Sequence, residues 1–150
     1  MRWLATTSAV EVDRPVEAVW EFVTEVANLP RWVRGVSEPA LTSGGPLGVG
    51  STLRSQYRYA GRSHELAYVV TGCDAPGWLS IRSTAGPFPV ELSLALTPVG
   101  SGVRVEKRTN AGSDGWATAA SFVLLGPLLR WTMRRQMGKE LAGLKGWLEG

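Results

Sequence analysis

The most constraining feature of the sequence is the apolar pattern of its last third. A helix of about 30 residues is ~45 Å long and cannot bury an apolar stripe by itself. Residues 117–149 carry large apolar side chains at steps of three or four, which places one stripe on one helix: Phe122, Leu125, Leu129, Met133, Met137, Leu141, Leu144 and Leu148. The rest of the chain has to cover this stripe.

The preceding residues read mainly as strands. Residues 8–12 alternate as a first strand, and Pro15 opens a short helix that ends near residue 27. A second helical turn follows at 28–32, with Trp32 as its large apolar anchor. Turns rich in glycine and proline then separate six further segments of strand character. We expect residues 110–115 to be a flexible lead into the final helix.

These elements predict an α+β fold of the helix-grip type. Consecutive hairpins favour an antiparallel sheet of about seven strands, and the twist of such a sheet allows it to curl around the long C-terminal helix. The two short helices then fill the space between strands one and two. We expect one domain over residues 1–150, with a cavity between the sheet and the helix.

The composition narrows the classes of partner. Hydrophobic residues at 44% and charged residues at 19% are ordinary for a globular chain. The net charge of +3 is scattered without a basic run, so we expect no nucleic-acid partner. The most apolar stretch, 123–133, is about half as long as a membrane span, so we expect no transmembrane segment. We expect a cytoplasmic protein, because no signal peptide is recognisable and Cys73 has no cysteine to pair with.

The inventory of reactive side chains is sparse. A catalytic triad needs a histidine base and a structural zinc site needs four Cys or His ligands, whereas the chain has one of each residue. We therefore predict no metal and no cofactor, and we assign no catalytic residue. His64, beside a predicted hairpin turn, is expected to be exposed at an edge; the alternative is an acid or base at a pocket mouth.

Several segments resemble a known superfamily. They are residues 10–20 (VEVDRPVEAVW), 29–32 (LPRW), 48–51 (GVGS), 126–129 (GPLL) and 141–149 (LAGLKGWLE). They resemble the START-like, polyketide cyclase/dehydrase and lipid-transport superfamily, also called SRPBCC, whose fold is the helix grip. The resemblance implies a deep, mostly apolar pocket between the sheet and the C-terminal helix. It does not imply a reaction, because carriers, receptors and cyclases share this fold.

The candidate binding residues are apolar or aromatic positions expected on the inner face of the sheet and the helix. They are Trp32, Leu53, Tyr57, Tyr59, Leu79, Ile81, Leu92, Leu94, Val105, Phe122, Leu125, Leu129 and Met133. The two tyrosines can donate hydrogen bonds into a cavity or pack with their hydroxyls at the rim. Strand parity does not decide whether the charged residues Arg82, Glu91, Glu106 and Arg108 face inward.

The sequence favours the first of three functions, without firm evidence of catalysis. The first is binding of a hydrophobic small molecule, a lipid or a polyketide-like compound. The second is a cyclase or dehydratase whose pocket Tyr, Arg or Glu groups move protons. The third is an interaction module, because Leu128 and Trp131 fall off the apolar stripe beside basic residues and could form a homodimer or a membrane-surface contact. Alternatively, Pro127 kinks the helix or residues 43–50 cover this patch.

Overall fold

The computed structural model describes the backbone of residues 2–59, 61–86, 88–113 and 116–150, and their side chains except at 2, 3, 59, 113 and 116–126. The strands are β1 (Arg2–Val12), β2 (Val36–Leu41), β3 (Thr52–Tyr59), β4 (Arg62–Asp74), β5 (Trp78–Ala85), β6 (Val90–Val99) and β7 (Gly102–Ser113). The helices are α1 (Val16–Thr24), the 3-10 turn η1 (Val26–Asn28), α2 (Leu29–Trp32) and α3 (Trp116–Glu149).

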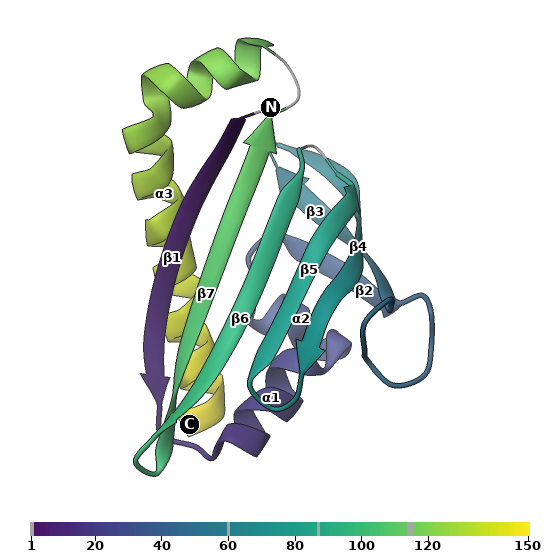
Figure 1. Ribbon diagram of the computed structural model, residues 1–150, viewed down its shortest axis with the longest axis vertical. Coiled ribbons are helices and arrows are strands. Elements are labelled where there is room, and N and C mark those ends of the chain that lie inside the picture. Colours follow the sequence, from purple (N-terminus) through teal and green to yellow (C-terminus); the bar gives the residue numbers. More distant parts are fainter. Residues whose placement is uncertain (1, 60, 87, 114–115) are drawn as a thin grey trace.

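The strands form one antiparallel sheet in the order β1-β7-β6-β5-β4-β3-β2. Hairpins join consecutive strands from β2 to β7, while β1 pairs with β7 at the opposite edge from β2. The segment α1–η1–α2 therefore crosses from one edge of the sheet to the other, and α3 runs along β1 (Figure 1). The predicted α+β helix-grip fold is confirmed.

Bulges bend the sheet toward the helices. The register of β4 against β5 shifts between Val70 and Gly72, and β2 is irregular between Ser37 and Ala40. Glu38 in this irregular part of β2 has a φ of 50°, which is uncommon for a residue with a Cβ. An extra residue on one strand increases the local twist and bends that strand. The long strands consequently curl and leave their inner face concave.

The strand β7 is longer than the sequence predicts. Residues 110–113 were expected to be a flexible lead, but β7 continues to Ser113 and pairs with β1 throughout, so that Leu4 lies opposite Ala111 and Arg2 opposite Ser113. The reason is that β1 itself begins at Arg2 and supplies backbone partners for this extension. The first helix is shorter than expected and ends at Thr24, whose Oγ1 donates to the carbonyl of Trp20 at 2.7 Å.

The densest core lies at the end of the sheet covered by α1, α2 and the last turns of α3. Leu141 and Leu144 of α3 are 1% and 0% exposed and pack in one cluster with residues of β1, β6, β7 and both short helices: Val12, Val19, Val23, Trp32, Leu94, Leu96, Val103 and Val105. Full burial of one such side chain contributes about 1.5–3 kcal/mol. We call this part of the molecule the closed end.

Hydrogen bonds anchor the closed end of α3 to the elements beneath it. Lys145 Nζ donates to the carbonyl oxygen of Glu11 at 2.8 Å, and Glu149 Oε2 accepts from the backbone N–H of Asp13 at 2.9 Å. Trp147 Nε1 donates to the carbonyl oxygen of Arg31 at 3.1 Å.

Toward its N-terminus, α3 contains Pro127, which has no N–H for the helical ladder. None of the helices, over the described residues, combines the length and apolarity needed to cross a membrane.

Candidate functional site

Two adjoining cavities separate the sheet from the helices. The larger has a volume of about 350 Å³ and lies beneath the middle of α3, and the smaller has a volume of about 110 Å³ and lies above α1 and α2. Five residues line both cavities: Val33, Val36, Tyr68, Leu92 and Lys107. We therefore describe them as a larger and a smaller lobe of one site, with these shared residues at their junction.

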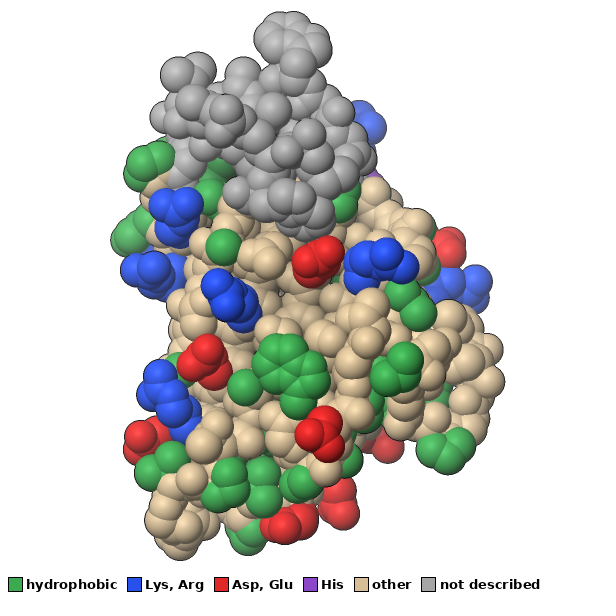
Figure 2. All heavy atoms as spheres, in the orientation of Figure 1, with side chains coloured by type: hydrophobic (Ala, Val, Ile, Leu, Met, Phe, Trp, Pro, Cys, Tyr) green, Lys and Arg blue, Asp and Glu red, His purple; other side chains and the backbone are tan. Residues whose placement is uncertain are grey.

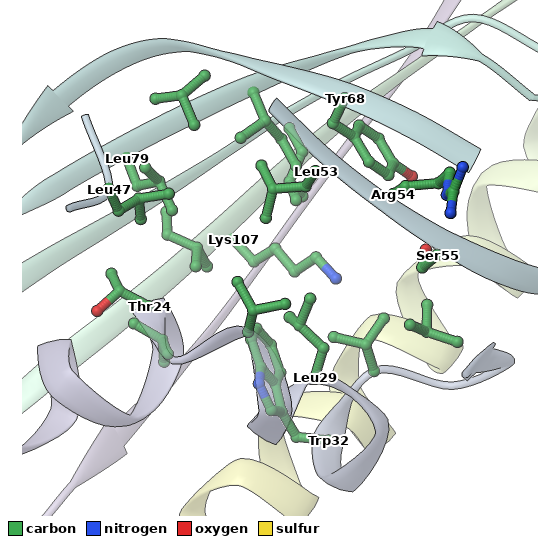
Figure 3. Close-up of a pocket in the computed structure, with 18 residues that line it drawn as sticks. Thr24, Leu29, Trp32, Leu47, Leu53, Arg54, Ser55, Tyr68, Leu79 and Lys107 are labelled. Carbon is green, nitrogen blue, oxygen red and sulfur yellow. The ribbon is translucent and has the colours of Figure 1, made fainter. Parts of the chain in front are cut away.

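The smaller lobe is walled mainly by aliphatic side chains. The short helices contribute Val23, Leu29 and Trp32, and Figure 3 shows the Lys107 side chain reaching across the lobe between Trp32 and Leu53. Six of the residues predicted from the sequence line this lobe: Trp32, Leu53, Leu79, Ile81, Leu92 and Leu94. The alternation of β3, β5 and β6 places the five strand residues among them on the concave face.

The larger lobe is walled by strand residues, mainly of β4, β6 and β7, on one side and by α3 on the other. Among the predicted residues, Tyr57, Leu92, Leu129 and Met133 line it. Leu4, Leu66, Val90, Ala111 and Met137 are further apolar residues of this wall. The flexible thioethers of Met133 and Met137 give this wall side chains that can adapt to different shapes. The pattern of the sequence therefore brings predicted helix and strand residues together in one place.

The other predicted residues lie elsewhere or are outside the described set. Val105 is 0% exposed and packs in the closed-end core, and it is not among the residues that line either lobe. It shares the inner face of β7 with Lys107, but it lies nearer the end covered by α1. The side chains of Tyr59, Phe122 and Leu125 lie outside the described residues.

A buried ion pair stands at the junction of the lobes. Lys107 Nζ lies 2.7 Å from Glu140 Oε2, and the two residues are 6% and 4% exposed. Glu140 Oε1 accepts from the backbone N–H of Arg34 and from Gln136 Nε2, both at 3.3 Å. Lys107 Nζ also lies 5.4 Å from the centre of the Trp32 ring. The burial of both charges is tolerated because each is matched by the other and by these further contacts.

Sequence reasoning missed this pair, although a signal for it exists. Val103 and Val105 are on the inner face of β7, so the period of two puts Lys107 on the same face. Glu140 lies three residues after Met137 and four before Leu144, and hence within the apolar stripe of α3. Strand alternation did not decide whether four charged residues face inward. None of the four lines either lobe: Arg82, Glu91, Glu106 and Arg108.

Tyr68 is a second polar group at the junction. Burial, followed by the neighbouring Tyr57, raises the pKa of the Tyr68 phenol to about 12. The low polarity of the surroundings disfavours the phenolate, so Tyr68 remains a neutral hydrogen-bond donor over the physiological pH range. On β4, the buried residues Leu66 and Val70 lie two positions before and two positions after Tyr68. Because alternate residues of a strand share one face, this pattern in the sequence predicts that the Tyr68 side chain points inward.

His64 is not placed as expected. The sequence predicted an exposed edge histidine, whereas His64 is half-buried on β4, an inner strand of the sheet, where it pairs with Tyr57 of β3. It does not line either lobe. Among the described residues, no cluster of three or more His, Cys, Asp or Glu side chains could hold a metal ion.

The outer side of α3 carries an exposed apolar patch, which we define as Leu128 and Trp131. These side chains are 58% and 57% exposed, so the loop at 43–50 does not cover them. The Arg135 guanidinium lies 5.5 Å from the centre of the Trp131 ring. Figure 2 shows basic side chains along the edge formed by α3, interleaved with hydrophobic ones.

A family model described as polyketide cyclase / dehydrase and lipid transport matches residues 4–149. The chain therefore belongs to this family, and the superfamily predicted from the sequence motifs is confirmed. No curated protein sequence gives a significant match.

Solved structures repeat the same fold over nearly the whole chain. The protein TTHA0849 from Thermus thermophilus is 17% identical, with a TM-score of 0.75 over 95% of this chain and 94% of that one. A START superfamily protein from Mycobacterium smegmatis is 16% identical, with a TM-score of 0.75 over 97% of each chain. The di-domain ARO/CYC StfQ from the steffimycin biosynthetic pathway is 14% identical, with a TM-score of 0.76 over 98% of this chain and 51% of that one. Identities this low show the shared fold alone.

Proposed function

We propose that the protein binds a hydrophobic small molecule, a lipid or a polyketide-like compound, in the two lobes between the sheet and α3. The observation that supports this most directly is the pair of adjoining cavities of about 350 and 110 Å³ with predominantly apolar walls. Ligand sites in proteins commonly occupy some 300–1,000 Å³ and combine apolar walls with a few polar groups. Family membership and the fold shared with an ARO/CYC protein agree with this function.

A cyclase or dehydratase is the second candidate, because Tyr68, Lys107 and Glu140 converge on the same site. Proton transfer needs a group that both gains and loses a proton near the working pH. The pKa of Tyr68 is raised away from neutrality, Lys107 and Glu140 are bonded to each other, and His64 does not line the site. These features favour binding over catalysis.

Two experiments test this choice. Native mass spectrometry of freshly purified protein should detect a bound apolar molecule, and a neutral naphthyl ketone dye should bind saturably at about one molecule per chain. Absence of saturable binding across a panel of neutral and anionic apolar probes would contradict the proposed function. Turnover of an aromatic polyketide substrate that disappears in Tyr57→Phe or Tyr68→Phe would instead establish the enzyme.

We also propose that the Leu128 and Trp131 patch contacts an anionic membrane surface. The positive charge around the patch supports this proposal. Residues 127–139 contain no acidic residue and four basic residues, all of them exposed: Arg130, Arg134, Arg135 and Lys139. An exposed tryptophan and leucine with basic neighbours suit the interface of an anionic bilayer, where each basic residue near the surface contributes about 1 kcal/mol. Met133 and Leu129 line the larger lobe from the same part of α3, so contact there would bring the site close to lipid.

A further inference from the structure

The junction of the two lobes offers hydrogen-bond donors in excess of acceptors. A lysine ammonium has three N–H groups, and Glu140 Oε2 accepts one of those of Lys107. Tyr68 lines both lobes and contributes a phenol that remains protonated. Figure 3 shows the Lys107 side chain extending across the pocket, while the Tyr68 ring points from the pocket wall toward Arg54. In the wall of the smaller lobe, Trp32 Nε1 is buried without a hydrogen-bond partner among the described residues.

The strongest acceptor at the junction is already used within the protein. Glu140 Oε2 is bonded to Lys107, and Oε1 accepts from the backbone N–H of Arg34 and from Gln136 Nε2. A ligand donor would have to compete with these three bonds. A ligand acceptor meets no such competition, because it can use donor capacity that Lys107 and Tyr68 still have.

The charge balance at the junction decides between a neutral and an anionic acceptor. Lys107 and Glu140 neutralise each other, so a buried carboxylate placed at the junction would meet Glu140 without a surplus cation to balance it. Burying a charge without a partner is costly, whereas burying a neutral oxygen requires only hydrogen bonds. Arg34 and Arg54 lie at the walls, but both are exposed to water, where ion pairing contributes little.

We propose that the junction binds the neutral acceptor oxygen of a compact apolar ligand, such as a ketone, ester or amide carbonyl, with Lys107 and Tyr68 as its donors. The two lobes on either side then hold the apolar parts of the same molecule. This inference rests on the proposed binding function and narrows it to one ligand chemistry. A site of this kind differs from a site for free fatty acids, because a fatty acid carries a charged carboxylate.

The experiment compares three dyes that share one dialkylaminonaphthalene body. The first carries a ketone, the second carries a carboxylate at the same position, and the third lacks the acyl group. Because one hydrogen bond contributes at least about 1 kcal/mol, the ketone should bind at least about fivefold more tightly than the dye without it. The carboxylate should bind at least about tenfold more weakly than the ketone.

Variants of the donors test the assignment. Tyr68→Phe removes only the hydroxyl, and Lys107→Met/Glu140→Gln removes both charges together so that neither is left buried and unpaired. Each should lower the ketone affinity about fivefold and raise the infrared stretching frequency of the bound carbonyl, while the dye without an acyl group should lose no affinity. Lys145→Met is the matched control, because this lysine is ion-paired to Glu149 at the far end of α3, and it should alter neither measurement.

The outcomes separate this inference from the proposed function. If all three dyes bind with equal affinity, or if the carboxylate binds most tightly, the cavity is a binding site but the neutral-acceptor assignment is wrong. If Tyr68→Phe and Lys107→Met/Glu140→Gln leave both the ketone affinity and the carbonyl frequency unchanged, the donors are misassigned. If none of the dyes binds saturably, the proposed function itself fails.

Discussion

The two halves of the described part of α3 pack in opposite ways. Leu141 and Leu144 are almost completely buried in a continuous core beneath the C-terminal half. About two to four turns earlier, Leu129 and Met133 line a cavity of about 350 Å³. Both pairs belong to the same apolar stripe, so the difference does not come from helical periodicity. It comes from what lies opposite: α1 and α2 cross the sheet only at the closed end.

The comparison shows that one amphipathic helix can carry both stability and a binding site. Side chains at the closed end interdigitate with helices and strands, and any change of their volume is felt by the core. Side chains of the preceding half, which includes Leu129 and Met133 and which we call the open half, cover a space that no other helix of the described residues fills. Glu140 lies at the boundary, where its ion pair with Lys107 closes the core toward the cavity.

The largest effect is expected from breaking the pair at this boundary. Glu140→Ala leaves Lys107 charged and buried, which should lower the free energy of unfolding by about 3–5 kcal/mol in denaturant titrations. Glu65→Ala is the matched control, because its pair with Arg54 is exposed and 3.9 Å long, and it should cost at most about 1 kcal/mol. Equal losses for the two variants would show that the boundary does not depend on a buried charge pair.

A smaller effect follows from the raised pKa of Tyr68 in the open half. The phenol ionises near pH 10 in the unfolded chain but near pH 12 in the folded protein, so the folded state holds its proton more tightly. The contribution of the protonated Tyr68 phenol to the stability of the folded protein is fully present below pH 10 and is lost as the pH rises to 12. Between these values wild type should lose about 2–3 kcal/mol more stability than Tyr68→Phe. Parallel stability curves for the two proteins would place Tyr68 in contact with water.

The smallest effect on stability is expected on the outer side of the open half. Trp131→Glu should change the free energy of unfolding by no more than about 0.5 kcal/mol, because the side chain is exposed. It should nevertheless abolish binding to anionic vesicles, and added salt should weaken the wild-type binding. Trp147→Glu is the control for vesicle binding, since Trp147 is 55% exposed at the closed end and also lies beside an arginine, and it should leave the binding to anionic vesicles unchanged.

Sedimentation completes this test of the patch. A concentration-dependent dimer that disappears in Trp131→Glu, with no binding to vesicles, would identify a second copy of the chain as the partner and contradict the membrane proposal. Equal vesicle binding by wild type and Trp131→Glu would also contradict it.

The fold was predictable because its signals are local. Steps of three or four in α3, alternation in β3 and β6, and glycine or proline at the turns each specify one element. Hairpins then leave few ways to connect the strands. The extension of β7 to Ser113 was missed because it depends on pairing with β1, which lies about a hundred residues away in the chain.

The site was predictable in its walls but not in its polar centre. Alternation along β6 and β7 places both Leu92 and Val105 on the inner face of the sheet. Whether such a residue is core or borders the cavity depends on where α1 and α2 cross the sheet, and this crossing makes Val105 core and leaves Leu92 beside the cavity. Lys107 and Glu140 were overlooked because a charged residue is normally solvated. Each charged side chain can be buried only when the other lies opposite it. The two residues are 33 positions apart in the chain, so their pairing depends on the tertiary structure.

The contrast between the two halves of α3 can be measured with one pair of tryptophan substitutions. Met133→Trp places a larger side chain next to a cavity, so it should alter stability by less than about 1 kcal/mol and weaken binding of the naphthyl ketone dye. Leu144→Trp enters a filled core and should destabilise the protein by about 1–3 kcal/mol or more, with dye affinity unchanged. Equal, large destabilisation by both substitutions with undiminished dye binding would contradict the account, because the open half of α3 would then be solid core.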